Sequence, residues 1–254
     1  MKTDLPPIHA RVDALDVSLF EAIDSQTHEP ERRSLLALQR ATARRHGRYA
    51  YLEIGSHLGG SIQPHLLDAR CARVFSIDPR PGQQPDDRSP GCRIDYVDNS
   101  TGRMLGLLKA LAPDAVAKIE CFESDAARMD PARIGEQPQL VFIDGEHTRG
   151  AALSDFRFCS RVVAADGVIA FHDFDYIYPA ILEICRALKR THPRCLPLKL
   201  DGTVFALFYD PSLVRADPYL SALLARNRNF LLRFRLRTWT ERLSRSIRRM
   251  TGKG

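Results

Sequence analysis

The sequence lacks the features that mark membrane-spanning proteins, secreted disulfide proteins and zinc proteins. No stretch approaches the roughly 18 uncharged apolar residues that a membrane-spanning helix needs. Residues 1–7 do not contain the apolar core of a secretory signal peptide. The six cysteines are scattered without a C-x-x-C pair, which is typical of reduced and mostly buried thiols. We therefore expect a cytoplasmic protein.

Positive charge is unevenly distributed along the chain. The net charge is +6, but residues 215–254 hold eleven Arg or Lys against two acids, a balance of +9. The rest of the chain therefore carries −3. With 254 residues and 44% hydrophobic content, the chain has room for one α/β domain plus additions and can bury a full core.

A glycine-rich turn follows the apolar run at 51–54, in the sequence Y-L-E-I-G-S-H-L-G-G-S of residues 51–61. Glycine lets the backbone approach a ligand closely, and the helix that follows presents free N–H groups to the same ligand. A second apolar run, residues 72–77, also ends in a carboxylate, Asp78. Together these features predict a nucleotide-binding βαβ unit in which the acid binds ribose hydroxyls. The spacing is not the dinucleotide G-x-G-x-x-G, because His57 stands where its second glycine should be.

Three later apolar runs also end in polar residues. Residues 117–122 are followed by Ser124 and Asp125, which suit the exocyclic amine of an adenine or cap the next helix. The other two runs end in the sequences D-G-E-H at 144–147 and H-D at 172–173. Because the carboxyl ends of parallel strands meet at one edge of a sheet, we expect these side chains to lie close together there.

The last pair of predicted strands, residues 195–200 and 203–209, is joined by Asp201-Gly202, a strong hairpin signal. The order of elements therefore predicts an α/β protein. Its fold is a Rossmann-like, doubly wound seven-stranded sheet, mostly parallel, that closes with a C-terminal antiparallel hairpin. Two N-terminal helices, broken near 28–30, precede the sheet. The Pro- and Gly-rich residues 79–91 are expected to lack regular structure and to suit a flexible lid.

This pattern resembles the class I S-adenosylmethionine-dependent methyltransferases, most closely the branch named methyltransferase domain 24. The resemblance covers roughly residues 48–210. It rests on the E-I-G-x-x-x-G-x-S loop at 53–61, the F-I-D-G-E-H run at 142–147 and the D-G-V-I-A-F-H-D run at 166–173. It implies S-adenosylmethionine as the cofactor, bound by residues of the glycine-rich loop and the strand ends: Glu53, Gly55, Ser56, Gly59, Gly60, Ser61, Asp78, Ser124, Asp125 and Asp144.

The resemblance also implies a methyl acceptor that must lose a proton. His147 is a candidate general base, since imidazole titrates near neutral pH. Asp144 and Asp173, with His172 or Glu146, are instead candidate ligands for Mg²⁺. In a third interpretation, His147 and His172 have no catalytic role and only form hydrogen bonds that stabilise the loops. We count His147, Asp173 and His172 as the candidate catalytic residues.

We expect three parts: an N-terminal helical cap at 1–47, the methyltransferase domain at 48–212 and a basic amphipathic helical tail at 213–254. The predicted function is O-methylation of a small-molecule, sugar or glycoconjugate hydroxyl. An RNA methyltransferase and a non-catalytic nucleotide-binding module are the alternatives. For the tail, residues 215–254, three partners stay open: an anionic membrane surface, nucleic acid, or the body of the protein.

Overall fold

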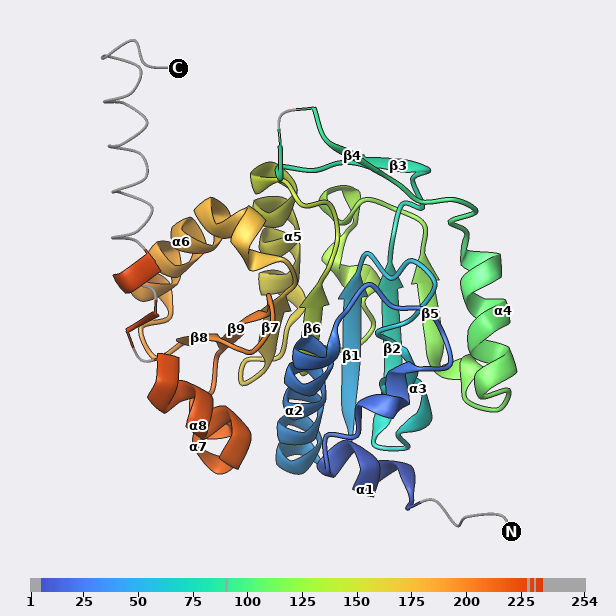
Figure 1. The fold of residues 1–254 in the computed structure, drawn as a ribbon, viewed down its shortest axis with the longest axis horizontal. Coiled ribbons are helices and arrows are strands. Elements are labelled where there is room, and N and C mark those ends of the chain that lie inside the picture. Colours follow the sequence, from blue (N-terminus) through green and yellow to red (C-terminus); the bar gives the residue numbers. More distant parts are fainter. Residues whose placement is uncertain (1–5, 90, 228, 231, 235–254) are drawn as a thin grey trace.

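Seven strands form one sheet in the computed structural model, which describes residues 6–89, 91–227, 229–230 and 232–234 (Figure 1). The sheet order is β5-β2-β1-β6-β7-β9-β8. All neighbouring strands are parallel except that β9 runs antiparallel to both β7 and β8. The strands are β1 (Tyr49–Ile54), β2 (Cys71–Ile77), β5 (Ile119–Phe122), β6 (Leu140–Ile143), β7 (Val168–Phe171), β8 (Leu196–Lys199) and β9 (Phe205–Phe208). The predicted fold class is confirmed.

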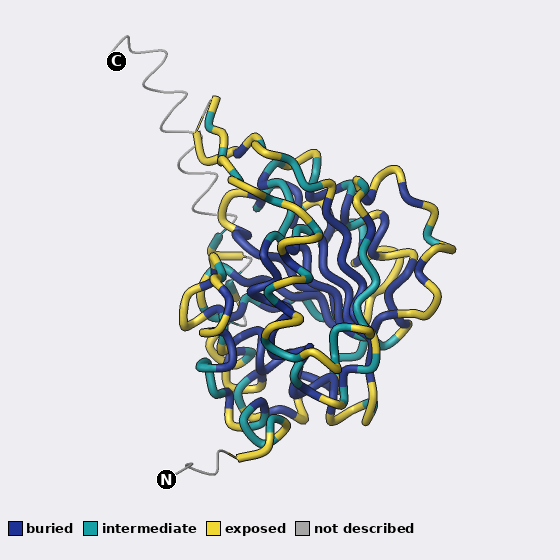
Figure 2. Tube along the Cα trace, turned by 90° about the vertical axis from the view of Figure 1, so that its right-hand side faces the viewer, coloured by how far each residue is buried: buried dark blue, intermediate teal, exposed yellow. Residues whose placement is uncertain are grey.

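Helices cover both faces of this sheet. They are α1 (Ile8–Asp13), α2 (Glu29–His46), α3 (Gln63–Leu67), α4 (Thr101–Leu111), α5 (Arg149–Val162), α6 (Phe174–Thr191), α7 (Ser212–Ala216) and α8 (Pro218–Asn227). Short 3-10 turns lie at η1 (Val17–Phe20), η2 (Val116–Lys118), η3 (Ala126–Arg128) and η4 (Pro131–Arg133). Figure 2 shows the strands as the buried centre between these layers.

The side chains of the strands point alternately to the two faces of the sheet, and they form a separate hydrophobic cluster on each face. In β1, Tyr49 and Tyr51 face the cluster that contains α2, α3 and α4, whereas Leu52 and Ile54 face the cluster that contains α5 and α6. Side chains of a strand point alternately to opposite faces, so an unbroken apolar run fills both layers at once. This explains why every residue of β1 is buried.

The chain reverses its direction of winding between β1 and β6. From β1 it proceeds to β2 and β5 on one side, and β6 and β7 lie on the other side. Doubly wound sheets bind ligands outside the carboxyl ends of the strands at this switch point. The predicted site residues follow those strand ends.

Three local predictions were wrong. Residues 79–91 do not lack regular structure, because β3 (Gln83–Pro85) pairs antiparallel with β4 (Arg93–Asp95) in a separate small hairpin. The strand predicted from residue 117 begins at Ile119, after the turn η2. The sequence predicts a helix over residues 178–190, but α6 begins at Phe174, and Pro179 lies inside it. Because proline has no N–H, the hydrogen bond from position 179 to the Asp175 carbonyl is absent from this helix.

The predicted basic tail is described only in its first part. Residues 235–254 lie outside the described residues, and so does most of the predicted interface with membrane or nucleic acid. Within the described part, Leu223 of α8 is buried. The rings of Phe230 and Phe234 pack on Phe174 with centroids 5.5 and 5.4 Å away. These apolar side chains therefore contact the body of the protein. No described helix combines the length and the apolar content needed to cross a bilayer.

Candidate active site

The glycine-rich loop is shaped by close backbone approach. Gly55 has φ +84°, and a Cβ atom on it would lie 2.2 Å from the carbonyl oxygen of Asp144, at the end of the neighbouring strand β6. A Cβ on Gly60 would lie 2.4 Å from the carbonyl oxygen of Asp24. A Cβ on Gly59, also at φ +84°, would lie 2.9 Å from Leu108 of α4. Only glycine fits at these positions, so the loop can pass under the N-terminal segment and beside β6.

Glu53 lies in the interior beneath this loop. Its side chain is fully buried and accepts hydrogen bonds from the Tyr51 hydroxyl at 2.6 Å and the Ser61 hydroxyl at 2.5 Å. Burial raises the pKa of Glu53 to about 8, although the two hydroxyl groups oppose the shift. Both carboxyl oxygens are thus occupied by hydroxyl groups that can rotate toward a ligand.

Asp78 is held by a residue that sequence reasoning missed, Arg80. One oxygen of Asp78 accepts from the His57 backbone N–H at 3.0 Å, and the other accepts from the Arg80 backbone N–H at 2.8 Å. The Arg80 guanidinium lies 3.2 Å from Asp78 and also donates to the Ser56 hydroxyl at 2.9 Å. Arg80 therefore ties the ribose-binding acid of the family pattern to the glycine-rich loop.

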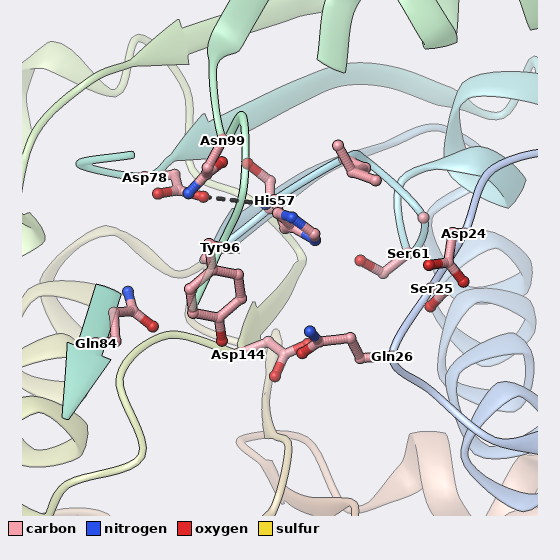
Figure 3. A pocket seen from close by; sticks show the side chains of 14 residues that line it. Asp24, Ser25, Gln26, His57, Ser61, Asp78, Gln84, Tyr96, Asn99 and Asp144 are labelled. Atoms are coloured by element: carbon pink, nitrogen blue, oxygen red, sulfur yellow. Dashed lines mark hydrogen bonds between the residues drawn. The ribbon is translucent and has the colours of Figure 1, made fainter. Parts of the chain in front are cut away.

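A cavity opens above this loop (Figure 3). Figure 3 shows Asp78, Asp144, Tyr96 and Gln84 around it, with the N-terminal residues 24–26 on the far side. Six of the ten predicted cofactor residues line it: Gly55, Ser56, Gly60, Ser61, Asp78 and Asp144. The roof is made by residues 24–26 and by the segment of the β3–β4 hairpin, part of which is the 79–91 stretch that was expected to suit a lid.

The two residues predicted beside the adenine differ in position. Asp125 lines a second cavity of about 410 Å³, which shares Gly55 and Gln84 with the first. Its carboxylate accepts from the Ala127 backbone N–H at 2.8 Å and so caps η3. Ser124 is outside that lining, and its hydroxyl donates to the Asp125 carbonyl at 3.2 Å.

Three predicted residues converge at the ends of β6 and β7. Nδ1 of His172 lies 2.9 Å from Asp144 Oδ1, and Nε2 of His147 lies 3.7 Å from the same oxygen. Burial alone would lower the pKa of His172, but the carboxylates of Asp144 and Glu31 raise it well above its usual value. Burial likewise opposes protonation of His147, whose pKa is nevertheless raised by Asp144, Asp173 and Asp86.

Asp86 orients His147. Its carboxylate is completely buried and lies 3.0 Å from Nδ1 of His147. The next residue, Asp87, donates its backbone N–H to the His147 carbonyl at 3.0 Å. Asp86 and Asp87 both belong to the 79–91 stretch, so this loop contacts the predicted catalytic residue His147 through both its side chain and its backbone.

Asp173 is predicted as both a catalytic residue and a metal ligand, and its carboxylate already has two partners. Arg88 donates to it at 3.0 Å and the Thr203 hydroxyl at 3.1 Å. Glu31 of α2 accepts from the same hydroxyl at 2.6 Å and lies 3.4 Å from Nε2 of His172. Sequence reasoning missed Glu31 and Arg88 along with Asp86.

Asp144, His147 and His172 also satisfy a geometric requirement for a metal site. One potential ligand atom from each lies within 4.8 Å of the other two. Three buried ring nitrogens, Nε2 of His147 and both nitrogens of His172, have no hydrogen bond of acceptable geometry. The donor set has two imidazoles, which favours Zn²⁺, Fe²⁺ or Mn²⁺ over the predicted Mg²⁺.

Solved structures of known proteins share this fold. A solved structure described as the O-methyltransferase NovP has a TM-score of 0.54 at 12% identity, covering 70% of this chain and 79% of that one. One described as the calicheamicin methyltransferase CalS11 has a TM-score of 0.52 at 14% identity, covering 81% and 93%. The cofactor-bound Rv0187 from MTB has a TM-score of 0.50 at 16% identity, covering 83% and 93%. None of the curated proteins matches the sequence.

The fold is therefore that of a class I methyltransferase. A family model described as a methyltransferase domain matches residues 52–174, from within β1 to the start of α6. The chain is similar to this family over that segment, which contains every predicted site residue.

Proposed function

We propose that the protein transfers the methyl group of S-adenosylmethionine to a hydroxyl group of a small molecule, with a sugar unit as the acceptor. The observation that carries this proposal is the position of the Asp144–His172 pair between two cavities. Asp144 lines the cavity above the glycine-rich loop, and His172 lines a further cavity of about 460 Å³. That volume lies within the range of small-molecule sites, about 300–1,000 Å³.

The lining of this acceptor cavity supports a polyhydroxylated ligand. Its side chains include two carboxylates, two imidazoles, a guanidinium, a hydroxyl and the ring of Tyr176: Gln26, His28, Glu31, Arg88, Ile94, His172, Asp173, Tyr176 and Thr203. Carboxylates accept hydrogen bonds from hydroxyl groups, and a guanidinium donates to their oxygens. CalS11 is described as a TDP-rhamnose 3′-O-methyltransferase, which supports a sugar hydroxyl as the acceptor here.

The proposed mechanism uses the His147–Asp86 pair. His147 is not itself in the lining of the acceptor cavity, but its Nδ1 lies 3.5 Å from Arg88 and 3.6 Å from Asp173, two residues of that lining. With its Nδ1–H donated to Asp86, His147 has Nε2 free to accept the proton of the acceptor hydroxyl. The oxygen then attacks the methyl carbon while the bond from that carbon to sulfur breaks, which releases S-adenosylhomocysteine. Asp86 stabilises the imidazolium that forms.

A metal ion is the alternative to this base, because Nε2 is the nitrogen of His147 that is not directed at Asp86, and this nitrogen cannot bind a metal ion and accept a proton at the same time. Asp144, His147 and His172 would hold it, and it would supply a Lewis acid that lowers the pKa of the acceptor hydroxyl. Asp173 is less available as a ligand because Arg88 and Thr203 already occupy its carboxylate.

Cofactor binding is the first test of the proposed function. We expect calorimetry to show micromolar affinity for S-adenosylmethionine and S-adenosylhomocysteine and none for NAD. Transfer of radiolabelled methyl to nucleotide sugars or glycosides would then support the acceptor class. Labelled RNA would support the alternative RNA methyltransferase, and the absence of cofactor binding would reduce the protein to a non-catalytic module.

Metal binding can be tested separately. We expect one equivalent of Mn²⁺ or Zn²⁺ to bind the native protein, and His172→Ala to weaken binding at least tenfold, or about 1.4 kcal/mol. Asp173→Asn is the matched control and should retain the metal, because its side chain is outside the three-residue group. If the native protein binds neither ion in titration calorimetry, His172 is an ion-paired bracing residue.

A further inference from the structure

Asp155 is a buried carboxyl that the chemistry above does not use. It lies on α5, its relative exposure is 6%, and it lines the second cavity together with Asp125, Glu146 and Gly145. A Cβ on Gly145 would lie 3.2 Å from Asp155 Oδ2, so the absence of a side chain there leaves that oxygen open. No described residue forms a hydrogen bond or an ion pair with its carboxyl.

No positively charged side chain in the described part of the chain forms an ion pair with Asp155. The groups that shift its titration from other elements are the carboxylates of Asp125 and Glu146, and the thiol of Cys159 lies one turn further along α5. Arg128 and Arg133, on the 3-10 turns packed against α5, form no ion pair with it. Burial raises the pKa of Asp155 to about 7. A buried polar group without a partner is costly, so a hydrogen-bond donor from a ligand would be strongly favoured here.

The cost of burying the Asp155 carboxylate without a partner should lower the melting temperature of the ligand-free protein. Since the pKa of Asp155 is about 7 in the folded state and near 4 when unfolded, its contribution to stability is lost as pH rises from about 4 to 7. Asp155→Asn has no such titration. We expect the variant to melt at least about 2 °C above the native protein at pH 8. The two should melt together at pH 4, as followed by circular dichroism.

The second cavity continues the cofactor path away from the glycine-rich loop. Both cavities share Gly55 and Gln84, and Pro79, directly after Asp78, lines the second one. A ribose bound at Asp78 would therefore place its base in the second cavity, where Asp155 forms part of the wall. This step rests on the proposed use of S-adenosylmethionine.

We propose that the carboxyl group of Asp155 accepts a hydrogen bond from the exocyclic amine of the cofactor's adenine and so selects the base. Asp125, the acid predicted for this contact, is exposed, and one of its oxygens caps η3. Asp155 is buried, and neither of its oxygens has a partner among the residues that the structure describes. The amine supplies the donor that this wall of the cavity lacks.

The contact between Asp155 and the amine is tested by changing the ligand and the protein separately and together, and by comparing the affinities. The ligands are S-adenosylhomocysteine and its analogue in which purine replaces adenine, so that only the amine is absent. In the native protein, removing the amine should weaken binding at least tenfold, as measured by calorimetry. In Asp155→Leu the same removal should change the affinity less than threefold.

Asp125→Leu is the matched control, and it should keep the full tenfold dependence on the amine. Equal dependence on the amine in Asp155→Leu and in the native protein would overturn the proposal. If Asp155→Leu does not fold, Asp155→Ala and Asp155→Asn are compared with the native protein in the same cycle. The proposal is then overturned if removal of the amine weakens binding to Asp155→Ala as much as binding to the native protein. Failure of the native protein to bind S-adenosylhomocysteine would instead refute the proposed function itself.

Discussion

Replacing His147 with alanine is expected to lower the rate of methyl transfer by about 10²- to 10⁴-fold, the usual contribution of a positioned general base. Nε2 of His147 is the buried, unpartnered nitrogen at the end of β6, and Asp86 fixes the opposite side of the ring. Cofactor affinity should change less than threefold, because His147 is absent from the lining of both cofactor cavities. Single-turnover rates with saturating cofactor measure the chemical step.

Alanine is a suitable substitution because it keeps the backbone contact of His147 with the 79–91 loop and removes the side-chain contact with Asp86. The Asp87 N–H donates to the His147 carbonyl, and alanine keeps that hydrogen bond. Asp86→Asn should lower the rate by a smaller factor, since it removes the charge that stabilises the imidazolium but leaves the imidazole in place. His192→Ala, at an exposed histidine away from the site, should have no effect. A native rate in His147→Ala would assign this histidine a bracing role.

The convergence of Asp144, His147 and His172 could be predicted because it follows from strand order alone. Asp144 and His172 come directly after parallel strands, His147 follows three residues after Asp144, and the ends of β6 and β7 are neighbours in the sheet. Asp86, Arg88 and Glu31 could not be found in this way. They reach the site from a loop and from a helix that no sequence periodicity connects to those strands.

The fold was predictable for a related reason. Long apolar runs with polar ends fix the strands, and Asp201-Gly202 fixes the final hairpin, in which Gly202 has φ +68°. The β3–β4 hairpin was missed because its two strands have three residues each, and proline and glycine around them indicate a loop. It is stabilised by contacts with the body, such as the bond between Asp87 and His147. Such contacts are invisible to local propensity.

The second large effect concerns Asp217, at the boundary where the basic tail was predicted to begin. Its carboxylate accepts two hydrogen bonds of 2.7 Å from Arg40 of α2, and the two side chains are 2% and 9% exposed. It also accepts from the backbone N–H groups of Tyr219 and Leu220, so it caps α8. Asp217→Ala leaves a buried guanidinium without its partner. We expect a loss of about 3–5 kcal/mol in the free energy of unfolding, measured with urea.

Glu183→Ala is the control, since its ion pair with Arg149 is about half exposed and should contribute at most about 1 kcal/mol. Replacing both members of the buried pair, as Arg40→Met with Asp217→Leu, should cost less than Asp217→Ala, because no charge is then left buried without a partner. A loss below 1 kcal/mol in Asp217→Ala would mean that α8 is only loosely attached. The expected loss would show that α2 and α8 unfold together with the sheet. The cofactor domain would then extend past the predicted boundary at residue 212, and the segment able to engage another partner would begin only after α8.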